Sequence, residues 1–150
     1  MRRDKLGRAK SLSNLGVIAQ HRQHYDEAER LYKESLQIMQ SRGDVIGISQ
    51  NLDNLGTIAQ NRHRFEEAED YYRRSLEINE RVGYREGVAF SLGALGGLLE
   101  SEGRFKEAEN SVSKALEIFT SIGDKPMQYK ASARLRKIHE KQRQDIIRQG

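Results

Sequence analysis

Three histidines are the side chains whose type and spacing first suggest chemistry, because a neutral imidazole is a common metal ligand. His21 and His24 lie three residues apart, and His63 follows 39 residues later. The spacing places no acidic residue with them, and the chain contains no cysteine. We expect all three at helix ends and turns, so we interpret them as surface residues and predict neither a metal site nor another cofactor.

No set of residues predicts catalysis. The letters GALGG at Gly93–Gly97 share only their glycines with a phosphate-binding loop, because no predicted strand precedes them and no Lys-Ser or Lys-Thr follows. None of the many serines is expected in the strained turn that exposes a nucleophile. The absence of cysteine excludes a catalytic thiol, a thiolate metal site and a disulfide framework. We therefore expect a protein that is not an enzyme.

Asn14 and Asn54 carry the side chains best suited to binding another molecule. Asparagine is unfavourable inside a helix, because its amide competes for backbone hydrogen bonds. The same amide offers donors and an acceptor, which suits a grip on the backbone of an extended peptide. Two interpretations stay open at this point: a contact with a ligand, and a hydrogen bond to a neighbouring repeat.

The two asparagines belong to a pattern that recurs every 40 residues. The letters NLG at Asn14–Gly16 return at Asn54–Gly56 and, as ALG, at Ala94–Gly96. The letters YDEAE at Tyr25–Glu29 return as FEEAE at Phe65–Glu69 and as FKEAE at Phe105–Glu109. A fixed period of this size indicates stacked supersecondary units.

Each unit is predicted to be a pair of helices. Apolar and small residues recur at helical spacing in its first half, at Leu12, Leu15, Gly16 and Ala19. They recur again in its second half, at Ala28, Leu31, Tyr32, Ser35, Leu36 and Met39. Gly43, Gly83 and Gly123 suit the left-handed residue that ends a helix, and Asp44 and Asp124 are expected to cap the helices that follow. The small residues Gly16 and Ala28, with their equivalents, are expected to let the two helices approach closely.

This pattern resembles the tetratricopeptide repeat, in a 40-residue form. The resemblance covers about residues 5–124 and rests on Leu15–Gly16, Ala19, Tyr25, Ala28, Tyr32 and Ser35 with their equivalents. Two departures are the leucines at the bulky tryptophan-type position (Leu12, Leu52 and Leu92) and the absence of a proline that closes the second helices. Repeats of this length with NLG are similar to those of kinesin light chains and of bacterial and archaeal scaffold proteins.

The resemblance implies an all-α fold, an α-solenoid that forms a right-handed superhelix. We expect a single domain over residues 1–150, with repeats at about 5–43, 44–83 and 84–123 and a capping helix at about 125–147. Pro126 suits the first turn of that helix. Arg136 stands where the repeats have glycine and Asp145 where they have an aromatic residue, so no second helix is expected to follow.

In this family, ligands bind the concave face, which the first helices line. The resemblance and the helical phase together predict a peptide-binding groove made of Lys10, Ser13, Asn14, Val17 and His21; Gln50, Asp53, Asn54, Thr57 and Asn61; Phe90, Gly93, Ala94 and Gly97; and Lys130, Arg134 and Lys137. The small residues around Phe90 either accept a hydrophobic anchor or tighten helix packing. The three cations of the last helix either hold acidic groups of a partner or form a solvated face.

Charge is unevenly distributed along the chain. Residues 1–10 carry a net charge of +4, residues 11–124 carry −6, and residues 125–150 carry +6. The longest apolar stretch, Val88 to Leu99, is too short to span a membrane. The leading hypothesis is a cytoplasmic interaction module or scaffold that binds a peptide segment of another protein. The alternatives are binding of nucleic acid or an acidic partner through the basic ends, and self-association through exposed faces of the terminal helices, which would give a homo-oligomer.

Overall fold

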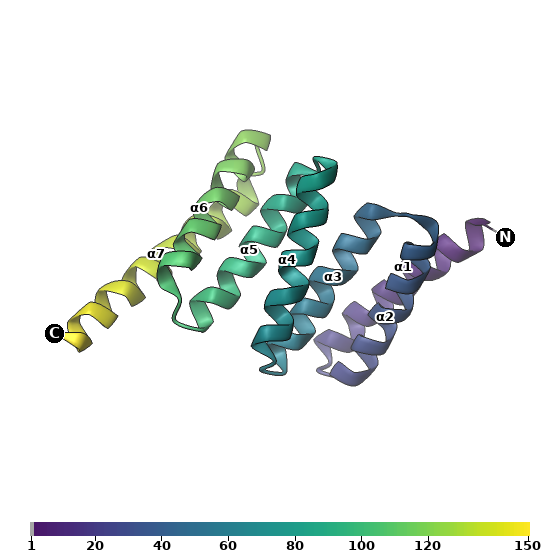
Figure 1. The fold of residues 1–150 in the computed structure, drawn as a ribbon, viewed down its shortest axis with the longest axis horizontal. Coiled ribbons are helices and arrows are strands. Elements are labelled where there is room, and N and C mark those ends of the chain that lie inside the picture. The colour runs from purple at the N-terminus through teal and green to yellow at the C-terminus, as the bar shows by residue number, and fades with distance from the viewer. Residues whose placement is uncertain (1) are drawn as a thin grey trace. The chain divides into compact units, whose positions relative to one another are not determined.

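A computed structural model shows seven helices, and residues 2–150 contain no strand (Figure 1). It describes the backbone of residues 2–150 and the side chains of residues 4–150. The helices cluster into two compact units, which meet in the sequence between Gly83 and Tyr84. Unit 1 contains α1 (Arg2–His21), α2 (Tyr25–Arg42), α3 (Val45–Asn61) and α4 (Phe65–Val82). Unit 2 contains α5 (Arg85–Ser101), α6 (Phe105–Ile122) and α7 (Lys125–Gln149). The prediction of an all-α fold of helical hairpins is confirmed.

The predicted helix ends lie where the sequence places them. Gly43, Gly83 and Gly123 have φ of 69°, 72° and 76°, in the left-handed region that glycine adopts without strain. Asp44 accepts a 3.0 Å hydrogen bond from the backbone N–H of Gly47. Asp124 caps α7 in the same way through Met127, at 3.1 Å.

Glycines allow the two helices of each hairpin to pack closely. A Cβ atom on Gly16 would lie 2.7 Å from a ring carbon of Tyr32, and one on Gly56 would lie 2.5 Å from the equivalent atom of Tyr72. Both tyrosine rings are buried. Each ring therefore occupies the volume that a larger residue on the first helix would fill, which confirms the role predicted for these glycines.

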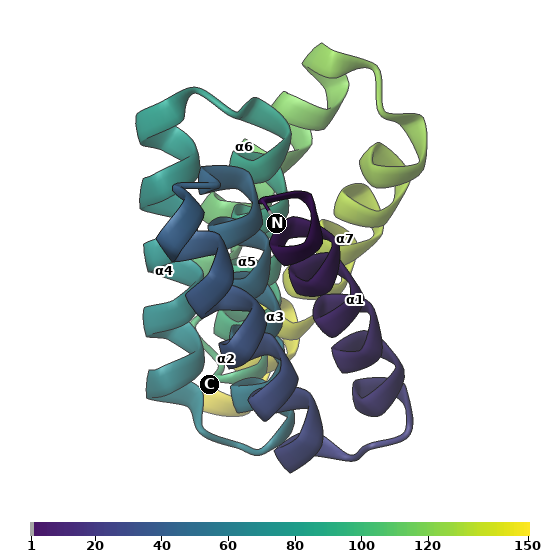
Figure 2. The same cartoon turned by 90° about the vertical axis from the view of Figure 1, so that its right-hand side faces the viewer.

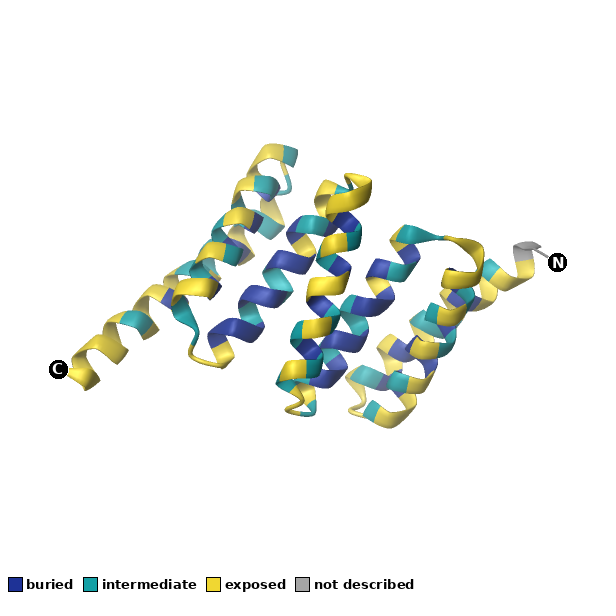
Figure 3. Cartoon of the chain, in the orientation of Figure 1, coloured by how far each residue is buried: buried dark blue, intermediate teal, exposed yellow. Residues whose placement is uncertain are grey.

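The first helix is less buried than its sequence pattern predicts. Leu15 is 51% exposed and Ile18 is 48% exposed, whereas Leu55 and Ile58, at the equivalent positions of α3, are each 2% exposed. Figure 3 shows the same contrast between α1 and α3. The prediction that Leu15 belongs to a buried stripe is wrong, because α2 covers this face of α3 and none of the described helices covers it on α1.

The last helix packs on α6 in the register of a fourth repeat. Ala131 and Ile138 are buried against the rest of unit 2. The earlier first helices end in a turn at residues 22–24, 62–64 and 102–104, but α7 continues through the equivalent residues 142–144 to Gln149. Residues 142–149 thus continue α7 where the earlier repeats have a turn and the start of a second helix. Neither α7 nor any other helix of the described chain is long and apolar enough to span a membrane.

Candidate functional site

The ten site residues predicted in unit 1 lie on α1 and α3 and differ in accessibility. Six are exposed: Lys10, Asn14, Val17, His21, Gln50 and Asn61. Four are half-buried: Ser13, Asp53, Asn54 and Thr57. The set is therefore accessible in part, and hydrogen bonding decides which of these polar groups remain available.

The amides of Asn14 and Asn54 make no side-chain hydrogen bond within the described part of the chain. Ser13, by contrast, donates to Asn51 at 2.9 Å and lies 2.7 Å from the hydroxyl of Ser35. Thr57 lies 3.2 Å from the hydroxyl of Tyr72. The two asparagines therefore keep their hydrogen-bonding capacity, while the serine and the threonine are used in holding the helices together.

Unit 2 contains a groove of about 680 Å³ between α5 and α7, with α6 at its base. Six of the seven site residues predicted in this unit line it: Phe90, Gly93, Ala94, Lys130, Arg134 and Lys137. A Cβ atom on Gly93 would meet no other atom within 4 Å, so this glycine leaves open space on the α5 side. The sequence pattern thus predicts residues that the fold brings together around one concave surface. We call it the unit 2 groove.

The unit 2 groove has an apolar floor and a cationic rim. Phe90 is 46% exposed and stands edge-on to the buried ring of Phe119, with their centroids 5.5 Å apart. Lys130 and Lys137 are exposed and form no ion pair with the described side chains. None of the residues described as lining the groove carries a carboxylate. The surface is therefore complementary to an apolar side chain that lies beside a negative charge.

Arg134 is the one cation of the groove that already has a partner. It donates a hydrogen bond to Glu100 at 2.8 Å, and Lys141 donates to the other carboxylate oxygen at 2.9 Å. Glu100 is only 5% exposed. Burial alone would raise its pKa, but the hydrogen bonds from Lys141 and Arg134 outweigh this and hold the pKa of Glu100 below its ordinary value. Arg134 therefore orients α7, and Lys130 and Lys137 are the freer charges.

The buried carboxylate was not predicted from the sequence, although two linked departures from the repeat mark it. In the first two repeats Tyr32 donates to Gln20 at 2.9 Å, and Tyr72 donates to Gln60 at 3.0 Å. The third repeat has Glu100 at the glutamine position, and a valine replaces the tyrosine. Loss of the neutral donor together with gain of a charge indicates that the carboxylate needs partners from elsewhere, and α7 supplies them.

Gly97 is placed differently from the other predicted groove residues of α5. A Cβ atom on it would lie 3.2 Å from Nη1 of Arg134. The guanidinium therefore covers Gly97, and the residue makes room for this side chain instead of lining the groove.

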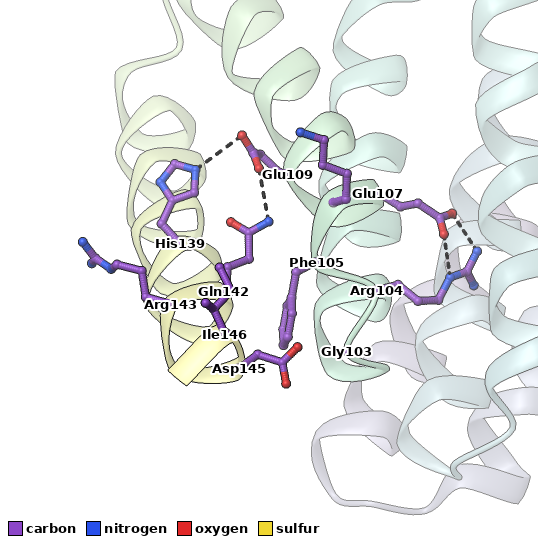
Figure 4. Close-up of a pocket in the computed structure, with 11 residues that line it drawn as sticks. Gly103, Arg104, Phe105, Glu107, Glu109, His139, Gln142, Arg143, Asp145 and Ile146 are labelled. Atoms are coloured by element: carbon purple, nitrogen blue, oxygen red, sulfur yellow. Dashed lines mark hydrogen bonds and ion pairs between the residues drawn. The ribbon is translucent and has the colours of Figure 1, made fainter. Parts of the chain in front are cut away.

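A second groove in unit 2, of about 810 Å³, lies between the start of α6 and the end of α7 (Figure 4). His139 and Gln142 both point to Glu109, at 3.6 Å and 3.3 Å. The hydrogen bond from Gln142 holds the pKa of Glu109 below its ordinary value. Phe105 and Ile146 add apolar surface. The groove exists because α7 does not turn at residues 142–144, and its lining charges are mixed in sign.

The three histidines singled out from the sequence are separate. His21 and His24 are exposed, and the ring of His63 packs edge-on against Phe65 with centroids 5.7 Å apart. The described side chains contain no cluster of three or more histidine, aspartate or glutamate residues that could hold a metal ion. In the basic N-terminal segment, the side chains of Arg2 and Arg3 lie outside the described residues.

Several solved structures have the same fold at sequence identities of 13–20%. The apo form of RapI is 17% identical with a TM-score of 0.84, over 94% of this chain and 39% of that protein. Aspartyl phosphate phosphatase F from Bacillus subtilis is 13% identical with a TM-score of 0.88, over 93% of this chain and 37% of its own. The TPR domain of Arabidopsis FLU is 20% identical with a TM-score of 0.71, over 81% of this chain and 99% of that domain. This chain thus spans less than half the length of the first and second proteins.

Family models agree with the fold. A tetratricopeptide repeat model matches residues 46–121, and a second tetratricopeptide repeat model matches residues 8–41. A comparison with curated protein sequences finds no significant match. The narrower similarity to kinesin light chains stays a prediction. The first model alone spans more than half of the 150 residues, and the chain therefore belongs to the tetratricopeptide repeat family.

Proposed function

We propose that this protein is a non-enzymatic interaction module that binds a segment of a partner protein in the unit 2 groove. Tetratricopeptide repeats typically act as scaffolds for other proteins, and the similar folds of RapI and phosphatase F support a role in protein–protein interaction. The observation that carries the proposal is the combination of an exposed phenylalanine and two unpaired lysines around one groove.

The bound segment places an apolar side chain on Phe90, in the open space beside Gly93. A neighbouring carboxylate of the segment lies within reach of Lys130 or Lys137, where rigid helices fix the positions of the lysine backbones. Burial of one leucine-sized side chain contributes about 1.5–3 kcal/mol, and the charges add specificity more than affinity.

In unit 1, Asn14 and Asn54 hold the backbone of a bound segment. An amide that has no partner within the described chain gives up only hydrogen bonds to water when it pairs with a peptide group, and such contacts are independent of the side chains of the segment. Unit 1 by itself therefore offers contacts that do not depend on the side chains of a segment, whereas the unit 2 groove by itself selects them.

A selection of displayed random peptides against the full chain tests this function. We expect the selected peptides to combine an aromatic or leucine residue with an acidic one. Gly93→Leu should fill the groove and weaken their binding about tenfold or more, because it occupies the space that the anchor needs. A peptide that binds unit 1 should be weakened by a similar factor in the double variant Asn14→Ala, Asn54→Ala, whatever its side chains.

Ile147→Ser serves as the matched control, because it removes an exposed apolar side chain of α7 that neither set of contacts uses. Selected peptides that bind the Gly93→Leu variant and the wild type equally would overturn the assignment of the groove. Equal binding by the double asparagine variant would overturn the assignment of unit 1.

A further inference from the structure

A second surface lies on the side of α1 away from α2 and consists of Ser11, Leu15 and Ile18 of the helix and of Arg22, which directly follows it. We call it the α1 face. Its two large apolar side chains are each about half exposed, and no helix of the described chain packs on it. Figure 2 looks onto this end of unit 1 and shows α1 in front, with nothing covering it from this side.

Unit 1 contains an occupied copy of the same surface 40 residues further along. On α3, Leu55 and Ile58 are buried in one cluster with Ala28 and Leu31 of α2. The α2·α3 contact therefore shows that a helix with small and aliphatic residues covers a leucine and an isoleucine spaced three residues apart at this position.

Charges complete that contact at the end of α3. Arg62 is 23% exposed and forms ion pairs with Asp26 at 2.7 Å and with Glu29 at 3.0 Å. Both carboxylates lie in the first two turns of α2, so α2 runs antiparallel to α3 and presents its N-terminal end to the arginine.

The α1 face repeats these features without the covering helix. Leu15, Ile18 and Arg22 stand 40 residues before Leu55, Ile58 and Arg62. Arg22 is exposed and has no acidic partner among the described side chains. The α1 face thus has both the apolar side chains and the cation of the α3 surface, at matching positions and without partners among the described residues.

The charge of α1 argues against a second copy of this chain as the occupant. Its first half carries Lys5, Arg8 and Lys10 against the single acid Asp4. Two antiparallel α1 helices would bring this segment of one copy beside Arg22 of the other, and like charges in a desolvated contact are unfavourable. An acidic helix avoids this repulsion.

We propose that the α1 face binds an amphipathic helix of a partner protein, antiparallel to α1. This helix has a stripe of small and aliphatic residues over Leu15 and Ile18 and two carboxylates in its first turns opposite Arg22. The site is independent of the unit 2 groove, and its partner class is fixed by the α2·α3 contact of the same chain.

The test uses a labelled synthetic peptide with the sequence of Tyr25–Arg42, added to the full chain and followed by fluorescence anisotropy. We expect saturable binding that the double variant Leu15→Glu, Ile18→Glu weakens by about tenfold or more. Arg22→Glu should weaken it by a smaller factor. Ile147→Glu is the matched control, because Ile147 is 77% exposed on α7, and it should bind the peptide as the wild type does.

A charge-reversed peptide separates a specific contact from general hydrophobic adhesion. The peptide with Asp26→Lys and Glu29→Lys should bind the wild type more weakly and should regain affinity for the Arg22→Glu variant. Both α1 variants should keep the helical content and melting temperature of the wild type, because the altered side chains are exposed.

Three results would overturn the proposal. The first is the absence of saturable binding, and the second is binding that the α1 variants do not change, as exchange of the peptide with α2 would give. The third is a dimer in sedimentation equilibrium that Leu15→Glu, Ile18→Glu dissociates, because it would make a second copy the occupant. A groove-filling Gly93→Leu variant should leave peptide binding to the α1 face unchanged.

Discussion

Arg134 on α7 donates a 2.8 Å hydrogen bond to Glu100 on α5, and its guanidinium lies directly over Gly97. The absence of a side chain at Gly97 gives the arginine its path across α5 to the buried carboxylate. Lys141, nearly two helical turns further along α7, donates to the other oxygen of the same carboxylate. One acidic residue thereby fixes two positions of the last helix.

Replacement of Glu100 by glutamine should loosen α7. We expect Glu100→Gln to lower the free energy of unfolding by about 1–2 kcal/mol at pH 7, because the amide loses the negative charge and accepts at one oxygen only, while its NH2 group faces the second cation. Thermal denaturation followed by circular dichroism measures the change. Glu117→Gln, on the exposed side of α6, is the control and should have little effect.

The stability difference between the wild type and the Glu100→Gln variant should also depend on pH. The folded state holds the pKa of Glu100 below its ordinary value of 4.5, so the unfolded state binds more protons in this range. The stabilisation is therefore complete above pH 4.5 and is lost as the pH falls through the lowered pKa. The difference in stability between wild type and Glu100→Gln should shrink in acid, and a constant difference down to pH 2 would contradict this account.

The effect of Gly97→Ala on stability should depend on the residue at position 134. A Cβ atom would lie 3.2 Å from the guanidinium of Arg134, so the gain in helix propensity is offset by displacement of the arginine. In an Arg134→Ala background that conflict is absent, and the substitution should stabilise by about 0.5–1 kcal/mol. A double-mutant cycle on chemical denaturation measures this coupling, and additive effects would show that Gly97 has no part in placing Arg134.

Two glycines of the first helices should respond oppositely to alanine. Gly56→Ala forces a Cβ atom to within 2.5 Å of the buried Tyr72 ring and should destabilise by about 1–3 kcal/mol. Gly93→Ala meets open space and should stabilise by up to about 1 kcal/mol. Urea denaturation of the two single variants gives both values, and equal effects would refute the packing role assigned to Gly56.

Tyr72 should make the fold sensitive to alkali. Burial raises the pKa of Tyr72 to about 12, with a smaller opposing effect of the hydrogen bond to Thr57, whereas the unfolded chain has its ordinary pKa of 10.0. Since the unfolded state releases the proton first, stability falls as the pH rises from 10 towards 12. The Tyr72→Phe variant should start less stable by about 1 kcal/mol but lose less stability over this range. Parallel slopes for the two proteins between pH 9 and 12 would contradict the shift.

The repeat made much of the fold predictable, because each 40-residue unit contains the residues that pack its two helices together and end the second one. Gly56 and Tyr72 are both visible in the letters, and the helix-ending Gly83 marks a boundary that the structure places at the same residue. Burial of Leu15 was predicted wrongly for a physical reason. Periodicity identifies the apolar side of a helix, but not whether another helix covers that side.

The candidate site was predictable in its positions more than in its partners. Phe90 and Lys130 follow from helical phase, because residues one step from the buried stripe point to the same side in every repeat. The pairing of Glu100 with Arg134 did not follow, since it joins residues 34 positions apart in a segment where the repeat is imperfect. Such contacts depend on how α7 packs against α5, and the residue pattern of a single helix does not predict this packing.

The uninterrupted course of α7 also bears on how this array could be lengthened by design. Extra hairpins appended after Gly150 would follow the end of the continuous helix α7, beyond the point where the earlier repeats turn, and would not stack in the register of those repeats. A graft should instead replace the chain from Gln142 onward with a copy of residues 62–83, which restores the left-handed turn residue His63 and a second helix. Arg136 would also have to become glycine, so that the tyrosine of the grafted helix could approach it.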